Sequence, residues 1–237
     1  MKSPIRDTTD DLRALVSMLG HDVRNSARAL AEVPVWIKED LADMGQSLPD
    51  GTEDHLRLIE IHAARLNKML NDLITFSRIG HANDVQTIDL DATLTATLAE
   101  LHLPPRFVVH RDLRCPQLQI GQKDFVVFLK ELLRNAVKHH HLEAGNIHVS
   151  SYLNDGECII TVSDDGPGVP DLHKSTVLEP MKTLRPRDEI EGSGMGLAIA
   201  KRVVDFYRGR FVLKDGRDGC GSALEASFDA SYAAIDS

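Results

Sequence analysis

Two long runs of apolar residues at helical spacing occupy the first third of the chain and limit what it can fold into. The first run advances mostly by three or four positions, through Leu12, Leu15, Val16, Leu19, Val23, Ala27, Leu30, Val33, Ile37 and Leu41. The second follows turn-forming residues 44–52 and comprises Leu56, Ile59, Ala63, Leu66, Met69 or Leu70, Leu73 and Phe76. This spacing predicts two helices, each with one buried stripe. Pro34 lies inside the first helix, where a kink is expected.

A single helical hairpin cannot bury two such stripes by itself. The usual solution is to pair with a second hairpin, which produces a four-helix bundle. Residues 8–80 are therefore predicted to form a homodimer. The alternative is that the hairpin packs on the C-terminal part of the chain.

A mixed pattern of helices and strands follows a polar break at residues 80–86. The turn Asn-Asp-Gly-Glu at residues 154–157 is typical of a β-hairpin. Hairpins mixed with helices indicate an α+β layered domain, predicted over residues 88–230. The expected helices are 90–101, 122–140 and 194–208, and the expected strands are 106–111, 146–153, 158–163, 211–214 and 223–228.

The composition excludes several classes of protein. Among 237 residues, 42% are hydrophobic and 27% charged, which is typical of a folded domain, and the net charge of −9 disfavours a nucleic-acid partner. No stretch approaches the ~18 apolar residues of a membrane span, and the first residues do not resemble a signal peptide. Three scattered cysteines fit neither a disulfide framework nor a zinc site. A cytoplasmic protein is expected.

The first candidate site is His21, which lies off the apolar stripe of its helix. Asp22 follows it directly, and Asn25 lies one turn further on the same face. A neutral imidazole nitrogen is nucleophilic near pH 7, and a neighbouring carboxylate can hold the proton on the other ring nitrogen. An ordinary solvent-exposed histidine is the alternative.

The second candidate is a polar face on the predicted helix 122–140. Glu131, Arg134, Asn135 and Lys138 are spaced so that they share one side of the helix. Carboxylate and amide oxygens suit Mg²⁺, and a lysine can neutralise phosphate. A simple solvated face is the alternative.

The third candidate is the segment that begins at Asp164, where an expected strand runs into the sequence DDGPG. Glycines at 166 and 168 allow the backbone to approach a ligand closely, and a buried carboxylate could accept from an adenine amino group. A plain turn is the alternative.

The fourth candidate is a glycine-rich segment that opens a helix. Gly192, Gly194 and Gly196 lead into the sequence LAIAKRVV, and free N–H groups at a helix N-terminus bind anions. The preceding loop contains Arg185 and other cations that could close over phosphates, although a surface loop is the alternative.

Taken in order, these segments resemble the kinase core of a two-component sensor histidine kinase over residues 8–229. MLGHDVRN resembles the H box, ELLRNAVKH the N box, DDGPG the first glycine box and EGSGMGLAIAKRVV the second, while VLEPMKTLRPRDE lies where the F box and ATP lid belong. The resemblance implies a dimeric histidine-phosphotransfer bundle, followed by an ATP-binding α/β sandwich of the Bergerat type.

The resemblance also implies a role for each candidate residue in the helical part. His21 would accept the phosphoryl group from ATP, and Asp22 would orient it and act as the base. Asn25 occupies a position that related kinases use to dephosphorylate their response regulator. The implied partners are a second copy of the chain, a response regulator receiver domain and a separate or upstream sensor.

In the ATP-binding part, the resemblance assigns Asn135 to Mg²⁺ with help from Glu131. Lys138 and His139 would lie near phosphate or ribose. Adenine would contact Asp164 in a pocket shaped by Gly166 and Gly168, and the phosphates would contact Gly192, Gly194, Gly196 and Arg185.

The sequence departs from the family pattern at several positions. Ser26 replaces a common proline, Glu131 replaces a common asparagine, and Leu178 and Met181 stand where phenylalanines are usual. The run His139–His141 is expected to stabilise the end of a helix rather than bind a metal. Two other functions remain open: a phosphotransfer hub with a degenerate ATP domain, and a protein serine kinase or ATPase of the GHKL class.

Overall fold

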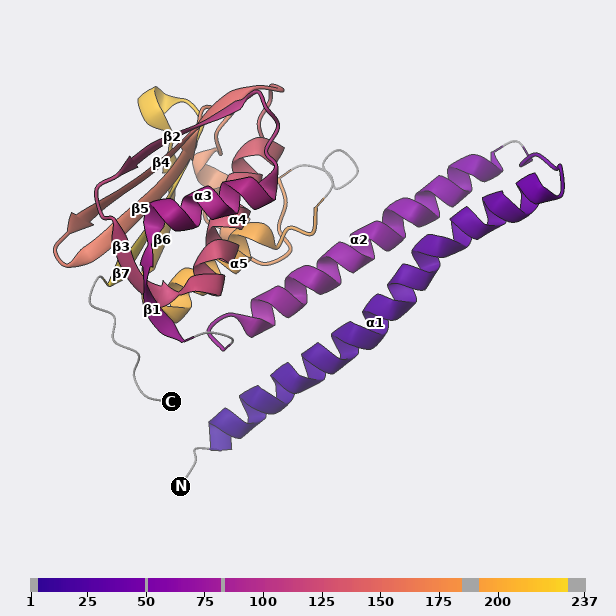
Figure 1. Cartoon of the computed structure of the whole chain (residues 1–237), viewed down its shortest axis with the longest axis horizontal. Helices are drawn as coiled ribbons and strands as arrows, with labels where there is room; N and C mark the ends of the chain where they lie inside the picture. Colours follow the sequence, from indigo (N-terminus) through magenta and orange to yellow (C-terminus); the bar gives the residue numbers. More distant parts are fainter. Residues whose placement is uncertain (1–3, 50, 82–83, 185–191, 230–237) are drawn as a thin grey trace. The chain divides into compact units, whose positions relative to one another are not determined.

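The computed structural model describes residues 4–49, 51–81, 84–184 and 192–229. The chain divides into two units. The first holds the residues up to Arg78 together with Gly192 and Ser193, and the second holds the remaining residues from Ile79 onward (Figure 1).

The first unit is a helical hairpin. Helix α1 (Pro4–Asp43) and helix α2 (Thr52–Arg78) are the two helices predicted from the apolar runs. α1 continues through Pro34, and this proline is buried in the hairpin. An ion pair of 3.0 Å joins Lys38 Nζ of α1 to Glu60 Oε1 of α2.

Much of each predicted stripe is not buried within this hairpin. On α1, Leu30 is 52% exposed and Ile37 is 37% exposed. On α2, Ile59, Leu66 and Leu73 recur at intervals of seven residues and are all exposed. The side chains that the single chain does bury include Ala27, Leu56, Ala63 and Ile74. An apolar surface therefore remains uncovered along α2 and along the part of α1 whose side chains are described.

The second unit is built on a five-stranded sheet with the order β2-β4-β5-β7-β6. β2 pairs with β4 in parallel, and the other neighbours are antiparallel. Figure 1 shows the helices on one face of this sheet. The strands are β2 (Phe107–Leu113), β4 (Gly145–Asn154), β5 (Glu157–Asp164), β6 (Arg210–Asp215) and β7 (Ser222–Asp229), and the helices are α3 (Leu90–Leu101), α4 (Gln122–Lys138) and α5 (Gly196–Phe206).

Helix α4 packs its apolar side into the core and leaves its polar side outside. Phe128, Leu132 and Leu133 are fully buried, as their spacing predicts. Edge-to-face contacts join the ring of Phe128 to those of Phe211 and Phe228. The packing fixes the rotation of α4, so that its polar face is turned away from the core.

A second, two-stranded sheet is an element that the sequence pattern did not predict. β1 (Val85–Asp89) pairs antiparallel with β3 (Gln117–Gly121). Each strand is short, and its partner lies about thirty residues away, so no local pattern reveals the pair. Three single-turn helices, η1 (Asp171–His173), η2 (Thr176–Leu178) and η3 (Arg217–Gly219), complete the described elements.

Within the described residues, no helix has the length and apolar character that crossing a membrane requires.

Candidate functional site

Asp164 ends strand β5 with a half-buried carboxylate. Its Oδ1 accepts hydrogen bonds from the backbone N–H groups of Gly166 at 2.9 Å and Ser222 at 3.3 Å. Burial raises the pKa of Asp164, although these two bonds oppose the shift. Its other oxygen, Oδ2, has no hydrogen-bond donor among the described residues. The arrangement leaves one acceptor available to an amino group of a ligand.

The turn that follows Asp164 is tight and depends on glycine. Gly168 has a φ of +73°, and a Cβ placed there would lie 2.9 Å from the carbonyl oxygen of Gly221. A Cβ on Gly166 would lie 2.7 Å from Oδ1 of Asp164. Side chains at these positions would therefore disturb the carboxylate or the neighbouring backbone.

The polar face of α4 carries oxygen donors that fit Mg²⁺. Glu131 and Asn135 lie one turn apart on this face and are both only partly exposed. Arg134 Nη1 lies 3.4 Å from Oε1 of Glu131. Mg²⁺ usually takes one or two protein oxygens and completes its shell with phosphate and water. The described residues contain no cluster of three or more metal-binding side chains, and such a site does not need one.

The glycines at the start of α5 allow close approach of neighbouring segments. A Cβ on Gly196, the first residue of the helix, would lie 2.7 Å from Oε2 of Glu131. Gly194 has a φ of +73°, and its Cβ would lie 2.9 Å from the carbonyl oxygen of Lys182. The structure therefore brings the start of α5 together with α4 and with the segment around Lys182.

Other predicted site residues are not brought into this arrangement. Gly192 groups with the first unit. His21 and Asp22 lie in α1, but their side chains fall outside the described part of the chain, as does the whole of Arg185. Asn25 is exposed on α1.

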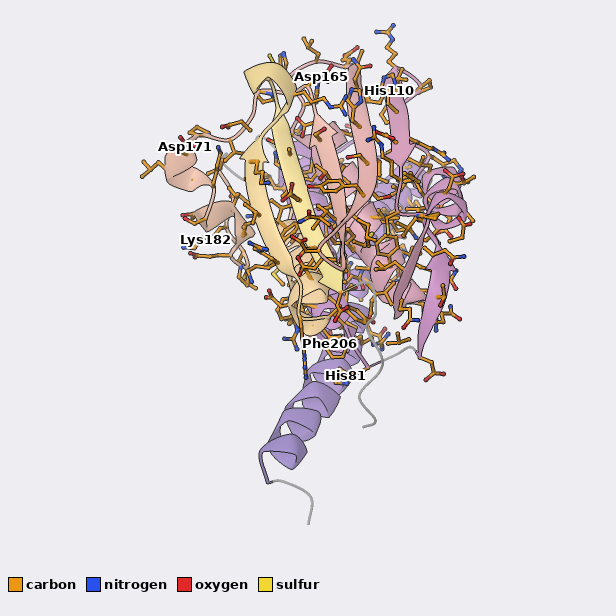
Figure 2. The ribbon with its side chains drawn as sticks, turned by 90° about the vertical axis from the view of Figure 1, so that its left-hand side faces the viewer. His81, His110, Asp165, Asp171, Lys182 and Phe206 are labelled. Carbon is orange, nitrogen blue, oxygen red and sulfur yellow. The ribbon has the colours of Figure 1, made fainter. Side chains whose placement is uncertain are left out.

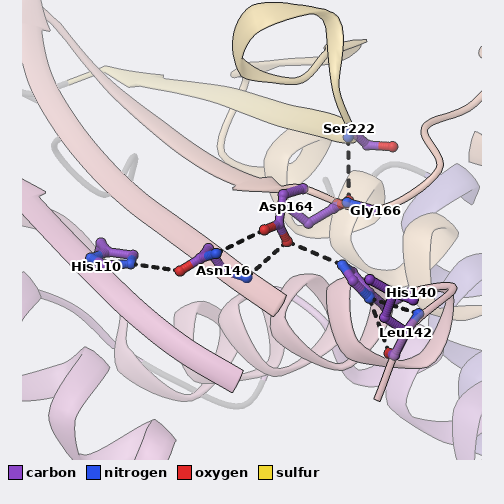
Figure 3. A network of polar contacts seen from close by, with 8 residues as sticks. His110, His140, Leu142, Asn146, Asp164, Gly166 and Ser222 are labelled. Carbon is purple, nitrogen blue, oxygen red and sulfur yellow. Dashed lines mark hydrogen bonds and ion pairs between the residues drawn. The ribbon is translucent and has the colours of Figure 1, made fainter. Parts of the chain in front are cut away.

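A network of polar contacts beside Asp164 was not predicted from the sequence (Figure 3). Asp165 accepts from the backbone N–H and from Nδ2 of Asn146, both at 2.8 Å, and from Nε2 of His140 at 3.1 Å. Oδ1 of Asn146 in turn accepts from Nε2 of His110 at 3.0 Å. Desolvation opposes ionisation of Asp165, but the bonds from Asn146 and His140 outweigh it and lower its pKa to about 2.

The first two of the three consecutive histidines make different contacts. His139 follows the last residue of α4, and its backbone N–H donates to the carbonyl oxygen of Asn135. The ring of His140 reaches Asp165, 25 residues away, so the expectation that these rings serve the helix end is wrong for His140. Two features of the sequence could have suggested this contact. Asp164 and Asp165 follow a predicted strand, and His139–His141 lie at the end of a predicted helix.

Comparison with known proteins identifies the family. Residues 121–231 match the family described as histidine kinase-, DNA gyrase B-, and HSP90-like ATPase. The chain is 28% identical over 223 residues to the signal transduction histidine-protein kinase AfsQ2 of Streptomyces coelicolor. This alignment covers 87% of this chain and 40% of AfsQ2. It is also 28% identical over 227 residues to the adaptive-response sensory kinase SasA of Thermosynechococcus vestitus, covering 89% and 58%. Residues 121–231 therefore belong to this ATPase family, and the comparisons support the catalytic core of a sensor histidine kinase.

The fold of this histidine kinase core is also found in solved structures. Full-length ShkA in complex with AMPPNP aligns with a TM-score of 0.66 at 21% identity, over 94% of this chain and 47% of ShkA. This likeness supports the α/β ATPase fold. The kinase core spans about half the length of the curated relatives named above.

Proposed function

We propose that this histidine kinase core transfers the γ-phosphoryl group of ATP to His21 and then to an aspartate of a response regulator receiver domain. The observation that carries the proposal is the carboxylate of Asp164, half-buried at the end of β5 with one oxygen open, inside a domain of the histidine kinase-like ATPase family. Both features support binding of a nucleotide by its adenine amino group.

In this proposal, residues within the ATPase family match, 121–231, hold the nucleotide from three sides. Asp164 accepts from the adenine amino group, and Gly166 and Gly168 keep the turn beside the base narrow. Lys138 and His139, at the end of α4, face the ribose or phosphates. Gly192, Gly194 and Gly196 enclose the phosphates, with Arg185 contributing a cation from the preceding loop.

The metal would be held on the polar face of α4. Asn135 supplies an amide oxygen to Mg²⁺, and Glu131 supplies a carboxylate close to the start of α5. When bound, Mg²⁺ would neutralise charge on the phosphates. The net charge of −9 on the chain makes such local neutralisation important, because the overall field opposes ATP.

The chemical step would be carried by the first unit. A neutral ring nitrogen of His21 attacks the γ-phosphorus, and the bond to the bridging oxygen of the leaving ADP breaks. Asp22 accepts the proton from the other ring nitrogen. The phosphoryl group then passes to the regulator aspartate, and Asn25 assists its later hydrolysis. Catalysis rests mainly on positioning and electrostatics.

The uncovered apolar surface of the hairpin supports a homodimer. Leu30 and Ile37 of α1 and the α2 residues Ile59, Leu66 and Leu73 would meet their counterparts in a four-helix bundle. Light scattering at micromolar concentration is expected to give twice the 26.2 kDa mass of the chain. A monomeric mass would contradict this part of the proposal.

The decisive experiment is phosphorylation by ATP and Mg²⁺, followed by acid treatment. The wild-type protein is expected to carry an acid-labile phosphoryl group, and His21→Gln is expected to carry none. His62→Gln is a matched control, since His62 is an exposed histidine on α2. Equal labelling of wild type and His21→Gln would rule out His21.

The same experiment separates the other functions. An acid-stable label would favour a serine kinase, and failure to bind ATP would favour a phosphotransfer hub. Asn25→Ala is expected to slow dephosphorylation of the regulator without preventing labelling of His21. An unchanged rate would remove Asn25 from the proposal.

A further inference from the structure

The ring of His140 is enclosed although it lies just beyond the end of α4. Its side chain is only 2% exposed. The ring of Phe107 contacts it edge-on, with ring centroids 5.3 Å apart. Nε2 of His140 lies 3.1 Å from Oδ1 of Asp165, and the backbone N–H of Leu142 donates to Nδ1 at 3.1 Å (Figure 3). Both ring nitrogens are therefore engaged.

The contact with Asp165 decides the role of Nε2. A carboxylate only accepts hydrogen bonds, so the ring proton belongs on Nε2, which faces Asp165. Nδ1 lies beside both backbone groups of Leu142, 3.1 Å from its nitrogen and 3.0 Å from its carbonyl oxygen. The bond to Asp165 is charge-assisted, and such bonds are stronger than those between neutral groups.

Two glycines leave the space that the ring occupies. A Cβ on Gly145 would lie 2.7 Å from Nε2 of His140 and 2.9 Å from Oδ1 of Asp165. A Cβ on Gly166 would lie 3.3 Å from Cδ2 of His140. The backbone of Gly145 does not have a positive φ, so alanine at this position would be opposed by this contact alone.

The bond between His140 and Asp165 joins two segments of the proposed nucleotide site. His140 follows Lys138 and His139 at the end of α4, and Asp165 follows Asp164 at the end of β5. Asp165 is itself held to the start of β4 by two bonds from Asn146. The end of α4 is therefore tied to the turn that carries the adenine-binding carboxylate.

We propose that His140 and Asp165 are positioning residues, and that their bond sets the spacing between α4 and the carboxylate of Asp164 for nucleotide binding. The inference rests on the proposed function. Neither residue contacts the nucleotide; each acts through its neighbour in the chain. Loss of the bond lets the two segments separate, which lowers nucleotide affinity while leaving the chemical step intact once ATP is bound.

The test compares two substitutions at His140. His140→Phe keeps a ring of similar size but removes the donor, whereas His140→Gln keeps a donor near the position of Nε2. We expect His140→Phe to raise the Kd for ATP and the KM for ATP about tenfold, with kcat within about twofold of wild type. His140→Gln is expected to recover most of the affinity.

Gly145→Ala tests the same bond without changing either partner. It is expected to weaken ATP binding about as much as His140→Phe, and the double variant should be no weaker than either single variant, because both remove the bond between His140 and Asp165. Asp112→Asn is the matched control, because Asp112 is an aspartate on β2 whose ion pair is with nearby Arg114. Its Kd should equal that of wild type.

The outcomes are distinct. Affinity in His140→Phe and Gly145→Ala within about twofold of wild type would overturn the inference, as would a loss in His140→Phe that His140→Gln does not restore. If the wild-type protein binds no ATP, the proposed function and this inference both fail. If the wild type binds ATP and the variants bind equally well, only the positioning role fails.

Discussion

The two ends of α4 hold polar groups in different ways. The helix has 17 residues, so its ends are separated by about 25 Å. At its start, the buried Asp124 accepts from the hydroxyl of Tyr207 at 2.8 Å and from the backbone N–H of Gly80 at 3.0 Å. The Tyr207 hydroxyl also accepts from the N–H of Gly121 at 3.0 Å. These groups satisfy one another inside the protein.

At the other end, the polar groups are partly exposed and one acceptor is unfilled. Asp164 keeps Oδ2 open, and burial of its charge raises its pKa. Figure 2 shows Asp165 at this end of the second unit, and His81 and Phe206 at the opposite end. A saturated, buried network stabilises a fold, whereas a desolvated charge with an open acceptor reduces stability and can bind a ligand. Substitutions at the two ends should therefore separate stability from nucleotide affinity.

The largest effect is expected at Asp164. Asp164→Asn should raise the Kd for ATP about 100-fold, because an amide NH₂ in place of Oδ2 cannot accept from the adenine amino group. The free energy of unfolding should stay within about 0.5 kcal/mol of wild type, since the amide oxygen can still accept from Gly166 and Ser222 and a desolvated charge is removed. Calorimetric titration and urea unfolding measure the two quantities. A variant that binds ATP normally would contradict the role of Asp164.

Tyr207→Phe should have the opposite profile. It removes a hydroxyl that joins Asp124 to the N–H of Gly121, so the buried groups lose a partner. We expect the free energy of unfolding to fall by about 2 kcal/mol while the Kd for ATP stays within about twofold of wild type. Urea unfolding beside ATP titration checks this. A large loss of affinity in a stably folded variant would show that the two ends of α4 are coupled.

A smaller effect is expected for Asp165, whose contribution to the free energy of unfolding depends on pH. Its pKa of about 2 lies below the ordinary value of 3.8, so its ionised form stabilises the folded protein above pH 4. Asp165→Asn should lower the free energy of unfolding by about 1 kcal/mol at pH 7, a discounted value because the side chain is 42% exposed. The difference should shrink as the pH falls from 4 towards 2. A difference independent of pH would argue against a role for the charge.

The smallest effect is expected at His110, the outer member of the same network. His110→Ala removes one donor to Oδ1 of Asn146, which is exposed to water. The free energy of unfolding should change by about 0.5 kcal/mol or less, and the Kd for ATP should not change measurably. A large increase in the Kd for ATP would show that His110, on β2, also contributes to nucleotide binding.

Local patterns in the sequence were sufficient to predict most of the helices and strands. The apolar spacing of α4 predicts its buried side, because residues three and four apart share one face of any helix. The turn at residues 154–157 predicts the hairpin of β4 and β5 in the same local way. The order of the glycine-rich and histidine-containing motifs was enough to indicate the histidine kinase family, which the comparisons confirm.

Only the tertiary structure decided which polar groups meet. β1 and β3 pair across about thirty residues, His140 reaches Asp165 across 25, and Tyr207 reaches Asp124 across 83. Their partners come from separate elements, whose side chains meet only after the sheet and helices have packed. Sequence periodicity records which side of an element is buried, because that depends on local geometry. It does not record which distant residue supplies the missing donor or acceptor, and at Asp165 and Asp124 that partner decides the role of the carboxylate.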